Sequence, residues 1–342
     1  MNKKDIRSMN LEEIEKQIVE MGHSKFRAKQ IYNWISKGKN DFNEMKNLPQ
    51  KLIIDLNDNF IINNIIIERV AESKDNTKKF LLKMVDGNII EAVLMKYKYG
   101  YSICVSTQVG CKMGCKFCAS TIGGKVRDLL PGEMLGQIFT LQNYAGERIR
   151  NVVLMGSGEP LDNYDNVMKF LELVNDDNGL NISHRNITVS TVGIVPKIYE
   201  LADKKLQITL AISLHEVDND KRTALIPSNE KYPVKEILKA CEYYTKVTKR
   251  RITFEYSLIN GVNDNIETAK ALGKTLKGML CHVNLIPINA VKEKNYLPSS
   301  ENNIVKFKET LENEGIVTTI RREMGSDINA ACGQLRNNYI NN

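Results

Sequence analysis

The chain reads ICVSTQVGCKMGCKFC from Ile103 to Cys118, a short apolar run followed at once by a cluster of cysteines. Cys111, Cys115 and Cys118 have the spacing C-x3-C-x2-C. Three thiolates on one tight loop can bind three irons of a 4Fe–4S cube and leave the fourth iron open to a further ligand. A structural zinc site needs a fourth Cys or His, and the next histidine in the chain is His184. We therefore predict an iron–sulfur cluster, with zinc and a distant fourth ligand as the alternative.

Strands and helices alternate in the sequence after this loop. Short connections between such units imply right-handed crossovers and a parallel sheet covered by helices, with the chemistry at the carboxyl ends of the strands. Too few units are present for a closed eight-stranded barrel, so we expect a partial, open α/β barrel of about six parallel strands. The expected strands are 103–106, 152–155, 187–190, 207–214, 252–258, 282–286 and 317–321, and the expected helices are 132–144, 164–175, 195–202, 234–245, 266–276 and 304–313.

Two smaller parts precede the strand-helix series. Leu11, Ile14 and Ile18 repeat at helical spacing, whereas the residues after position 77 alternate with period two around a turn at 86–88. The predicted division is a helical module at 1–75, a β-hairpin extension at 76–102, the barrel at 103–322 and a C-terminal segment at 323–342. The helical module is either a packing appendage or an RNA-contacting part.

Composition and charge limit the classes of protein to which the chain can belong. The 342 residues are 42% hydrophobic and 26% charged, as in ordinary globular proteins, and the net charge of +7 permits nucleic-acid binding without requiring it. No apolar run approaches the ~18 to 20 residues of a membrane span. The odd number of cysteines, seven, is unlike a secreted disulfide framework. We expect a cytoplasmic protein.

Several further segments make a family resemblance specific. The cysteine spacing after the first strand resembles the radical SAM superfamily, and the other segments resemble the RlmN-type dual-specificity adenine C2 methyltransferases. Ser157 and Asn329 depart from the usual residues of that family. The segments, which span nearly the whole chain, are CVSTQVGC (104–111), MGSGEPLDN (155–163), ISLH (212–215), HVNLIPIN (282–289) and DINAACGQL (327–335).

The resemblance implies a radical SAM (β/α)6 partial barrel and two cofactors. The open iron of the 4Fe–4S cluster would chelate S-adenosylmethionine, of which two molecules are used per turnover. Glu159 follows a strand and could accept from the methionine ammonium, or could belong to a tight turn at Pro160. His215 alone is as easily a structural group. The residues implied to line the S-adenosylmethionine site are Gly158, Glu159, Ser190, Ser213, Leu214, His215 and Asn289.

Three residues carry catalytic roles by the same resemblance. Cys332 would accept a methyl group, and a 5′-deoxyadenosyl radical would abstract hydrogen from it before the methylene radical adds to C2. Glu91 would act as the general base, and Cys104 would release the product through a transient disulfide with Cys332. The alternatives are two inert buried cysteines and a solvent-facing carboxylate. Cys241 and Cys281 have no matching role and are interpreted as core residues.

The function implied is methylation of adenine C2 in 23S rRNA and tRNA by a monomer that receives electrons from a flavodoxin or ferredoxin. The adenine C8 methyltransferases that confer antibiotic resistance share the cluster and both cysteines. The segments 158–161 (GEPL) and 321–323 (RRE) favour the C2 branch. A zinc-stabilised RNA-binding module without catalysis is the alternative of another class.

Overall fold

A ten-stranded mixed sheet forms the centre of the computed structural model, which describes residues 3–289, 291 and 293–335. Its strand order is β14-β13-β12-β11-β10-β9-β6-β5-β4-β3, and every pair from β6 to β14 is parallel. The strands are β3 (Ile66–Glu72), β4 (Lys78–Lys83), β5 (Ile89–Tyr97), β6 (Gly100–Cys104), β9 (Ile149–Leu154), β10 (Ile187–Thr191), β11 (Thr209–Ser213), β12 (Ile252–Leu258), β13 (Cys281–Pro287) and β14 (Thr318–Ile320).

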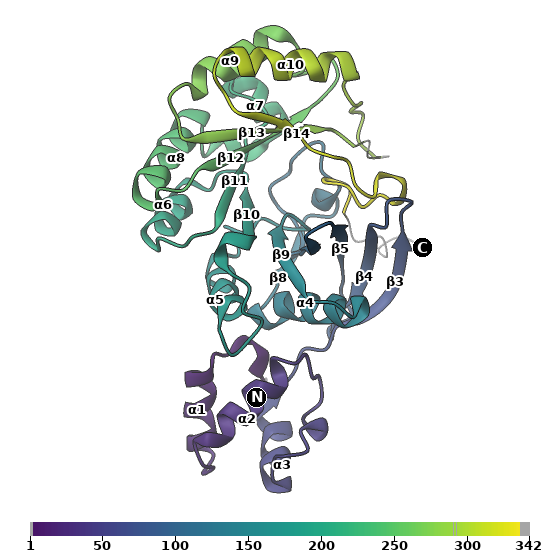
Figure 1. Cartoon of the computed structure of the whole chain (residues 1–342), viewed down its shortest axis with the longest axis vertical. Helices are drawn as coiled ribbons and strands as arrows, with labels where there is room; N and C mark the ends of the chain where they lie inside the picture. The colour runs from purple at the N-terminus through teal and green to yellow at the C-terminus, as the bar shows by residue number, and fades with distance from the viewer. Residues whose placement is uncertain (1–2, 290, 292, 336–342) are drawn as a thin grey trace.

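Helices connect the parallel strands and cover the sheet (Figure 1). Six strand-helix units begin at β6, β9, β10, β11, β12 and β13, and β14 adds a seventh parallel strand. The prediction of a partial, open α/β barrel is confirmed, because β14 and β3 remain separate edges of one open sheet. The helices are α4 (Pro131–Ala145), α5 (Tyr164–Asn175), α6 (Val195–Asp203), α7 (Asn219–Leu225), α8 (Val234–Thr248), α9 (Ile266–Leu276) and α10 (Glu301–Asn313).

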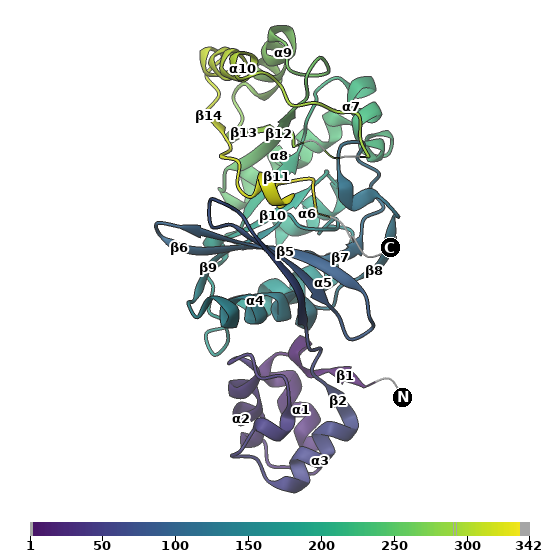
Figure 2. The ribbon, with the colours of Figure 1, turned by 90° about the vertical axis from the view of Figure 1, so that its right-hand side faces the viewer.

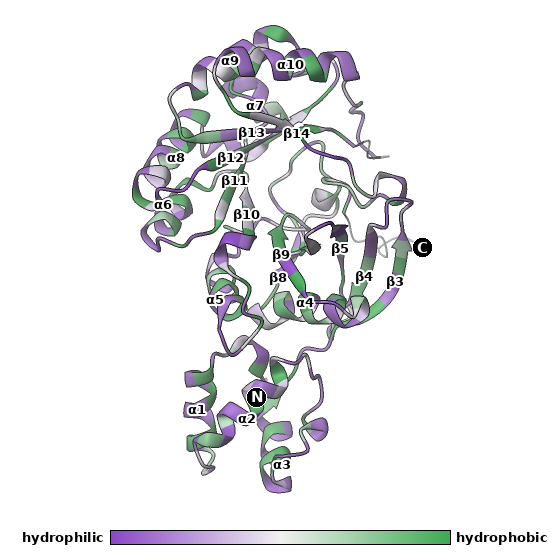
Figure 3. Ribbon diagram, viewed as in Figure 1, coloured by the Kyte–Doolittle hydropathy of each residue, from purple (hydrophilic) through white to green (hydrophobic). Residues whose placement is uncertain are grey.

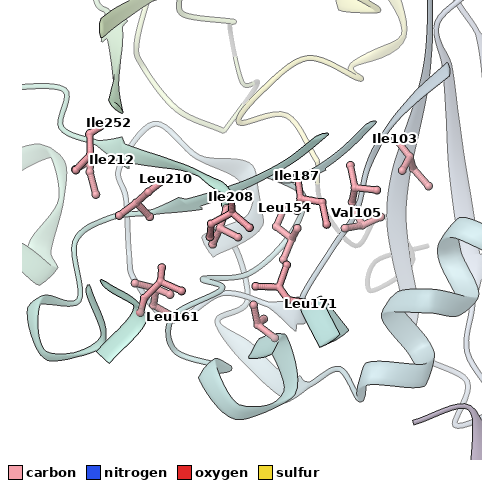
Figure 4. Packing of buried hydrophobic residues seen from close by; sticks show 14 of the residues in the cluster. Ile103, Val105, Leu154, Leu161, Leu171, Ile187, Ile208, Leu210, Ile212 and Ile252 are labelled. Carbon is pink, nitrogen blue, oxygen red and sulfur yellow. The ribbon is translucent and has the colours of Figure 1, made fainter. Parts of the chain in front are cut away.

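The apolar runs of the parallel strands form the main core. Ile103, Leu154, Ile187 and Ile212 are fully buried between neighbouring strands and the covering helices, where Leu171 of α5 packs (Figure 4). Parallel strands buried on both faces have near-continuous hydrophobic sequences, which explains why these segments were recognisable. The outer helices carry both hydrophobic and hydrophilic stretches, as amphipathic helices do (Figure 3). In the described part of the chain, no helix is long and apolar enough to cross a membrane.

The N-terminal helices pack around a core of their own at one end of the molecule (Figures 1 and 2). They are α1 (Leu11–Glu20), α2 (Phe26–Ile35) and α3 (Gln50–Asn59). Residues beyond α3 differ from the expected helical module, since 66–72 form β3 of the large sheet. This strand pairs antiparallel with β4, so the extension has three strands before β6, with the expected β4–β5 hairpin at its centre. Two small two-stranded sheets complete the described structure: β1 (Lys4–Asp5) pairs with β2 (Phe60–Ile61), and β7 (Gln108–Gly110) pairs with β8 (Lys125–Asp128) beside the cysteine loop.

The C-terminal segment lies against the turn between β3 and β4. Ser73 Oγ donates to Asp327 at 2.6 Å, and the Gly325 N–H donates to Asp75 Oδ2 at 3.1 Å. Lys79 Nζ of β4 donates to the Asn329 carbonyl at 3.1 Å. These bonds join residues about 250 positions apart, and they fix the backbone just before Cys332.

A fully buried arginine joins the carboxyl ends of β10 and β11. Arg222 of α7 donates to the carbonyls of Val192, Ser213 and Leu214 at 2.7 to 3.0 Å, and to Asn229 Oδ1 at 2.7 Å. Burial lowers the pKa of this guanidinium to about 10. Its fixed fork of donors therefore satisfies backbone carbonyls at the ends of the two strands, beyond the last pairing between strands.

Replacing Arg222 by Met should lower the free energy of unfolding by about 2–4 kcal/mol, because three buried carbonyls lose their donor. Chemical denaturation monitored by circular dichroism measures the change. Arg185→Met, which removes an exposed arginine, is the matched control and should stay within about 0.5 kcal/mol of wild type. Equal stability of the Arg222 and Arg185 variants would contradict a structural role for the buried fork.

Candidate active site

The three clustered cysteines line a cavity at the carboxyl ends of the parallel strands. Its volume is about 140 Å³, and its walls come from the cysteine loop, from the ends of β9 to β13 and from the C-terminal segment. This is the edge at which α/β sheets bind ligands. The residues that matter here are Cys111, Cys115, Cys118, Gly158, Glu159, Ser190, Ser213, His215, Glu255, Arg321 and Cys332.

Backbone hydrogen bonds hold the cysteine loop in place. The Cys111 N–H donates to the Gly124 carbonyl at 3.0 Å, and the Lys116 N–H donates to the Leu225 carbonyl at 2.9 Å. Gly110 has a φ of 74°, and a Cβ there would lie 2.0 Å from the Gly124 oxygen. Glycine is required at this position for both reasons.

The arrangement of the thiols fits a cube better than a single ion. Burial raises the pKa of Cys111 to about 12, and it also raises the pKa values of Cys115 and Cys118. A mononuclear zinc site surrounds one ion with four ligands, whereas a 4Fe–4S cube takes each thiolate on a different iron. Three sulfurs around one cavity therefore suit the cube.

Most residues expected at the S-adenosylmethionine site lie around this cavity. Gly158, Glu159, Ser190, Ser213 and His215 line it. Two expected residues do not. Leu214 is fully buried, and its N–H donates to the Glu255 carbonyl at 3.1 Å; Asn289 lines a second, adjoining cavity.

Glu159 and His215 each have firm partners in the protein. Glu159 accepts from the N–H groups of Leu161 and Val192, both at 2.9 Å, and burial raises its pKa to about 7. His215 Nδ1 accepts from the Ser257 N–H at 2.9 Å, and burial lowers the pKa of the ring to about 3. Both side chains are thus held rigidly at the wall of the cavity.

The second cavity contains the two remaining cysteines of interest. Cys104 and Cys332 both line it, together with Asn289, Tyr97 and Arg321. Cys332 and Arg321 also line the first cavity. The Cys332 side chain therefore lies at the boundary between the cavity of the cysteine loop and the cavity that contains Cys104.

Arg321 is a site residue whose role the sequence did not suggest. Its Nη1 lies 3.7 Å from Glu255 Oε2 and donates to Met155 Sδ at 3.5 Å. The pKa of this guanidinium is raised, first by the Cys332 thiol and then, against the effect of burial, by Glu255 and Cys104. Glu255 was missed as well. Glu255 lies in the middle of β12 and Arg321 directly after β14, and a charged residue within or directly after an expected strand is the signal that could have marked both.

Glu91 is buried, which contradicts the alternative of a solvent-facing carboxylate. It is 1% exposed, and Lys79 Nζ lies 3.4 Å from its Oε1. Side chains two residues apart on a strand share a face. Val93 and Tyr97 of the same strand line the second cavity, so Glu91 lies on that face of β5, although it does not itself line either of the two cavities.

The fold and this site define a radical SAM enzyme. The Radical SAM superfamily model matches residues 105–272, and the model of the ribosomal RNA large subunit methyltransferase N-terminal domain matches residues 4–62. The crystal structure of a radical SAM methyltransferase from Sphaerobacter thermophilus is 40% identical and superposes with a TM-score of 0.93, covering 97% of this chain and 99% of that chain.

Sequence relatives give the family. A protein of Clostridium botulinum (strain Alaska E43) named "Probable dual-specificity RNA methyltransferase RlmN" is 60% identical over 98% of this chain and 97% of its own length. A Clostridium beijerinckii protein of the same name is 61% identical over 97% of this chain and 94% of its own. The chain belongs to the RlmN family of radical SAM RNA methyltransferases, which use a 4Fe–4S cluster and S-adenosylmethionine. The resemblance is thereby confirmed, and the non-catalytic zinc module is contradicted.

Alkylation should distinguish the two thiols of the second cavity. Cys332 is partly exposed, whereas Cys104 is buried and burial raises its pKa to about 12. In the anaerobic, cluster-loaded protein we expect iodoacetamide to modify Cys332 at least about tenfold faster than Cys104, since the thiolate is the reactive form. Peptide mass spectrometry measures both rates, and denatured protein is the control in which the difference should vanish. Faster labelling of Cys104 would contradict its buried position.

Proposed function

We propose that this chain methylates C2 of adenine 2503 in 23S rRNA and of adenine 37 in tRNA through an S-methylcysteine at Cys332. The observation that carries the proposal is the place of Cys332 between two cavities. A thiol at that boundary can receive a methyl group from the side of the cysteine loop and deliver it to a base on the side of Cys104.

The first cavity is the proposed cofactor site. Cys111, Cys115 and Cys118 hold the cluster, which together with S-adenosylmethionine supplies a 5′-deoxyadenosyl radical when both are bound. The walls of that cavity and Asn289 of the adjoining one supply the remaining contacts, so the proposed S-adenosylmethionine ligands are Gly158, Glu159, Ser190, Ser213, Leu214, His215 and Asn289. Leu214 can act only through its backbone or its packing, because its side chain is buried away from the cavity.

The chain's own residues then handle the methyl carbon and the proton of the base. Cys332 carries the carbon that becomes bonded to adenine C2. Glu91 accepts the C2 proton, and Lys79 Nζ lies 3.4 Å from its Oε1. The electron that remains after radical addition and loss of the C2 proton would be taken up by the bound cluster. The Cys104 thiolate attacks the Cys332 sulfur and forms a disulfide, while the electron pair of the broken sulfur–carbon bond stays on the methylene carbon, which takes a proton and becomes the methyl group.

Arg321 fits this sequence of steps because a thiolate is needed at both cysteines. Its guanidinium lines both cavities with Cys332, and Cys104 contributes to its raised pKa. A fixed positive charge stabilises a thiolate against the cost of burial. We assign Arg321 the role of holding these two sulfurs in a reactive state.

The enzyme needs an electron donor and a surface that binds RNA. An external flavodoxin or ferredoxin supplies the electrons, the enzyme works as a cytoplasmic monomer, and the N-terminal module (residues 1–75) helps to hold the RNA. On α2 of that module, Phe26 is 56% exposed, and Arg27 lies over its ring at 4.5 Å. An exposed aromatic ring with neighbouring basic residues suits single-stranded RNA.

The two catalytic cysteines should fail differently when mutated. Cys104→Ala should still carry the methyl group and attack the RNA, then accumulate as a covalent protein–RNA adduct on a denaturing gel. Cys332→Ala should give no adduct, although its cluster cysteines are intact. Cys241→Ala, which removes a buried core thiol, is the control and should turn over. Normal turnover by Cys104→Ala without an adduct would refute the thioether route.

Mass-spectrometric mapping of the methylated adenine decides between the C2 and C8 branches. We expect methylation at C2, since residues 158–161 read GEPL and 321–323 read RRE. The enzyme is reconstituted with iron and sulfide, and deoxyadenosine is measured in the same reaction. A C8 product would assign the chain to the other branch. Deoxyadenosine without methylated RNA would support cleavage of S-adenosylmethionine but contradict the proposed methylation.

Removing two exposed lysines from the N-terminal module should weaken RNA binding, because two positive charges are lost. Lys25→Ala with Lys29→Ala removes two exposed cations, and we expect the affinity for tRNA to fall by about two- to tenfold with a shallower salt dependence. Lys239→Ala on α8 is the control for an exposed lysine elsewhere. An unchanged affinity and salt slope would refute RNA contact by this face of α2.

A further inference from the structure

Two tyrosines stack on each other at the tip of the hairpin between β5 and β6. The rings of Tyr97 and Tyr99 are nearly parallel, with an interplanar angle of 7° and centroids 5.0 Å apart. Tyr97 is partly buried at the second cavity, where its hydroxyl donates to Met95 Sδ at 3.7 Å. Tyr99 is 59% exposed. The inner ring is therefore anchored at the cavity, and the outer ring presents an open aromatic surface.

This tip extends the second cavity outward. Tyr97, Cys104 and Cys332 line the same cavity, and the pKa of Tyr97 is raised by burial first and then by its neighbours, among them Tyr99 and Cys332. Figure 2 shows the β5–β6 turn projecting at the edge of the molecule, beyond β9. The stacked rings thus lead from the thiols of the reaction to the outer surface.

The charges around the tip are mostly positive. Lys98 and Arg150 are exposed there. Lys96 is exposed as well, but it lies over the Tyr101 ring at 5.2 Å, on the face of β5 opposite to Tyr97. Arg150 is close, since a Cβ at Gly100 would lie 2.8 Å from its Cδ. Two carboxylates are nearby, Glu147 at 3.6 Å from Lys96 and Glu323 at the cavity, and exposed Arg322 lies beside Glu323 at the same wall.

A flat aromatic face among cations is suited to a nucleobase with its phosphates. Stacking on aromatic rings, with lysine and arginine along the backbone, is how proteins bind unpaired nucleotides. An adenine that enters a cavity must leave its stack, which also exposes the face of its neighbour. A peptide partner would be expected to bring carboxylates to the lysines but has no need of a parallel ring pair.

We propose that Tyr99, supported by Tyr97, stacks on the base of the nucleotide next to the target adenine. This inference rests on the proposed function, because it takes the second cavity as the place of the adenine. It adds a base-stacking subsite for single-stranded RNA to the site, and it gives the hairpin tip a direct part in holding the extruded conformation.

A double-mutant cycle between protein and RNA tests the contact. Binding is measured by fluorescence anisotropy with a labelled stem-loop RNA containing the target adenine and with two versions that have an abasic nucleotide on its 5′ or its 3′ side. Tyr99→Leu should weaken binding of the intact RNA by about 5- to 150-fold, which corresponds to ~1–3 kcal/mol for one stacked base. Tyr99→Phe keeps the ring and should stay within about twofold of wild type.

The abasic RNAs identify stacking itself. The wild-type protein should bind one of the two abasic RNAs more weakly than the intact RNA, by the same factor. Tyr99→Leu should bind that abasic RNA as tightly as it binds the intact RNA, because the stacking contact is already absent. Tyr144→Leu is the matched control: it removes a 44% exposed tyrosine on α4 that lines neither cavity, and its RNA affinity should be unchanged. The thermal unfolding midpoint of each variant shows that the hairpin still folds.

Two results would overturn the proposal. In the first, Tyr99→Leu binds the intact RNA as tightly as wild type does. In the second, each abasic RNA loses as much affinity with Tyr99→Leu as it does with wild type. Binding is measured without turnover, so this outcome is distinct from failure of the proposed function. If wild type methylates no adenine while the cycle shows coupling, the methylation proposal fails and the stacking subsite stands.

Discussion

The docking of the C-terminal segment is the interaction on which the active site depends. The Ala119 N–H donates to the Gly333 carbonyl at 2.7 Å, and Ser120 Oγ donates to the Leu335 carbonyl at 2.6 Å, so the segment is tied to the residues just after the cysteine loop. On its other side Lys79 donates to the Asn329 carbonyl. Cys332 is held between these two attachments. Without them its sulfur would have no fixed place between the cavities.

Buried and partly buried polar groups hold the rest of the site, because a charge in a low-dielectric interior must be paired. Arg222 satisfies carbonyls at the ends of two strands, and Arg321 faces Glu255 and two thiols. A buried charge is costly unless it is paired and hydrogen-bonded. The same burial raises the pKa of Cys104 to about 12, so a nearby fixed cation is needed for that thiol to react as a thiolate. Rigid polar contacts therefore serve both the fold and the chemistry.

Sequence patterns predicted the barrel and the cysteine loop, but several elements that complete the site were not predicted. β7 and β8 have three and four residues, and α7 has seven, too few for a hydrophobic period to be recognised. Residues 66–72 were placed with the helical module because β3 is an edge strand without a buried residue, so it lacks the apolar alternation that marks a strand in the sequence. Arg222 gave no signal either, since a single charged residue in a sequence is most often exposed.

The sequence by itself determined the spacing of the cysteine loop and the order of strands and helices. Both are local: three cysteines lie within eight residues of one loop, and each strand or helix has its own hydrophobic period. Only the tertiary structure brought Cys104, Cys332 and Arg321 around one cavity and buried Glu91 beside Lys79. These residues come from β4, β5, β6, the chain just after β14 and the C-terminal segment. Their distances depend on strand register and on hydrogen bonds between segments about 250 residues apart, which no local pattern in the chain encodes.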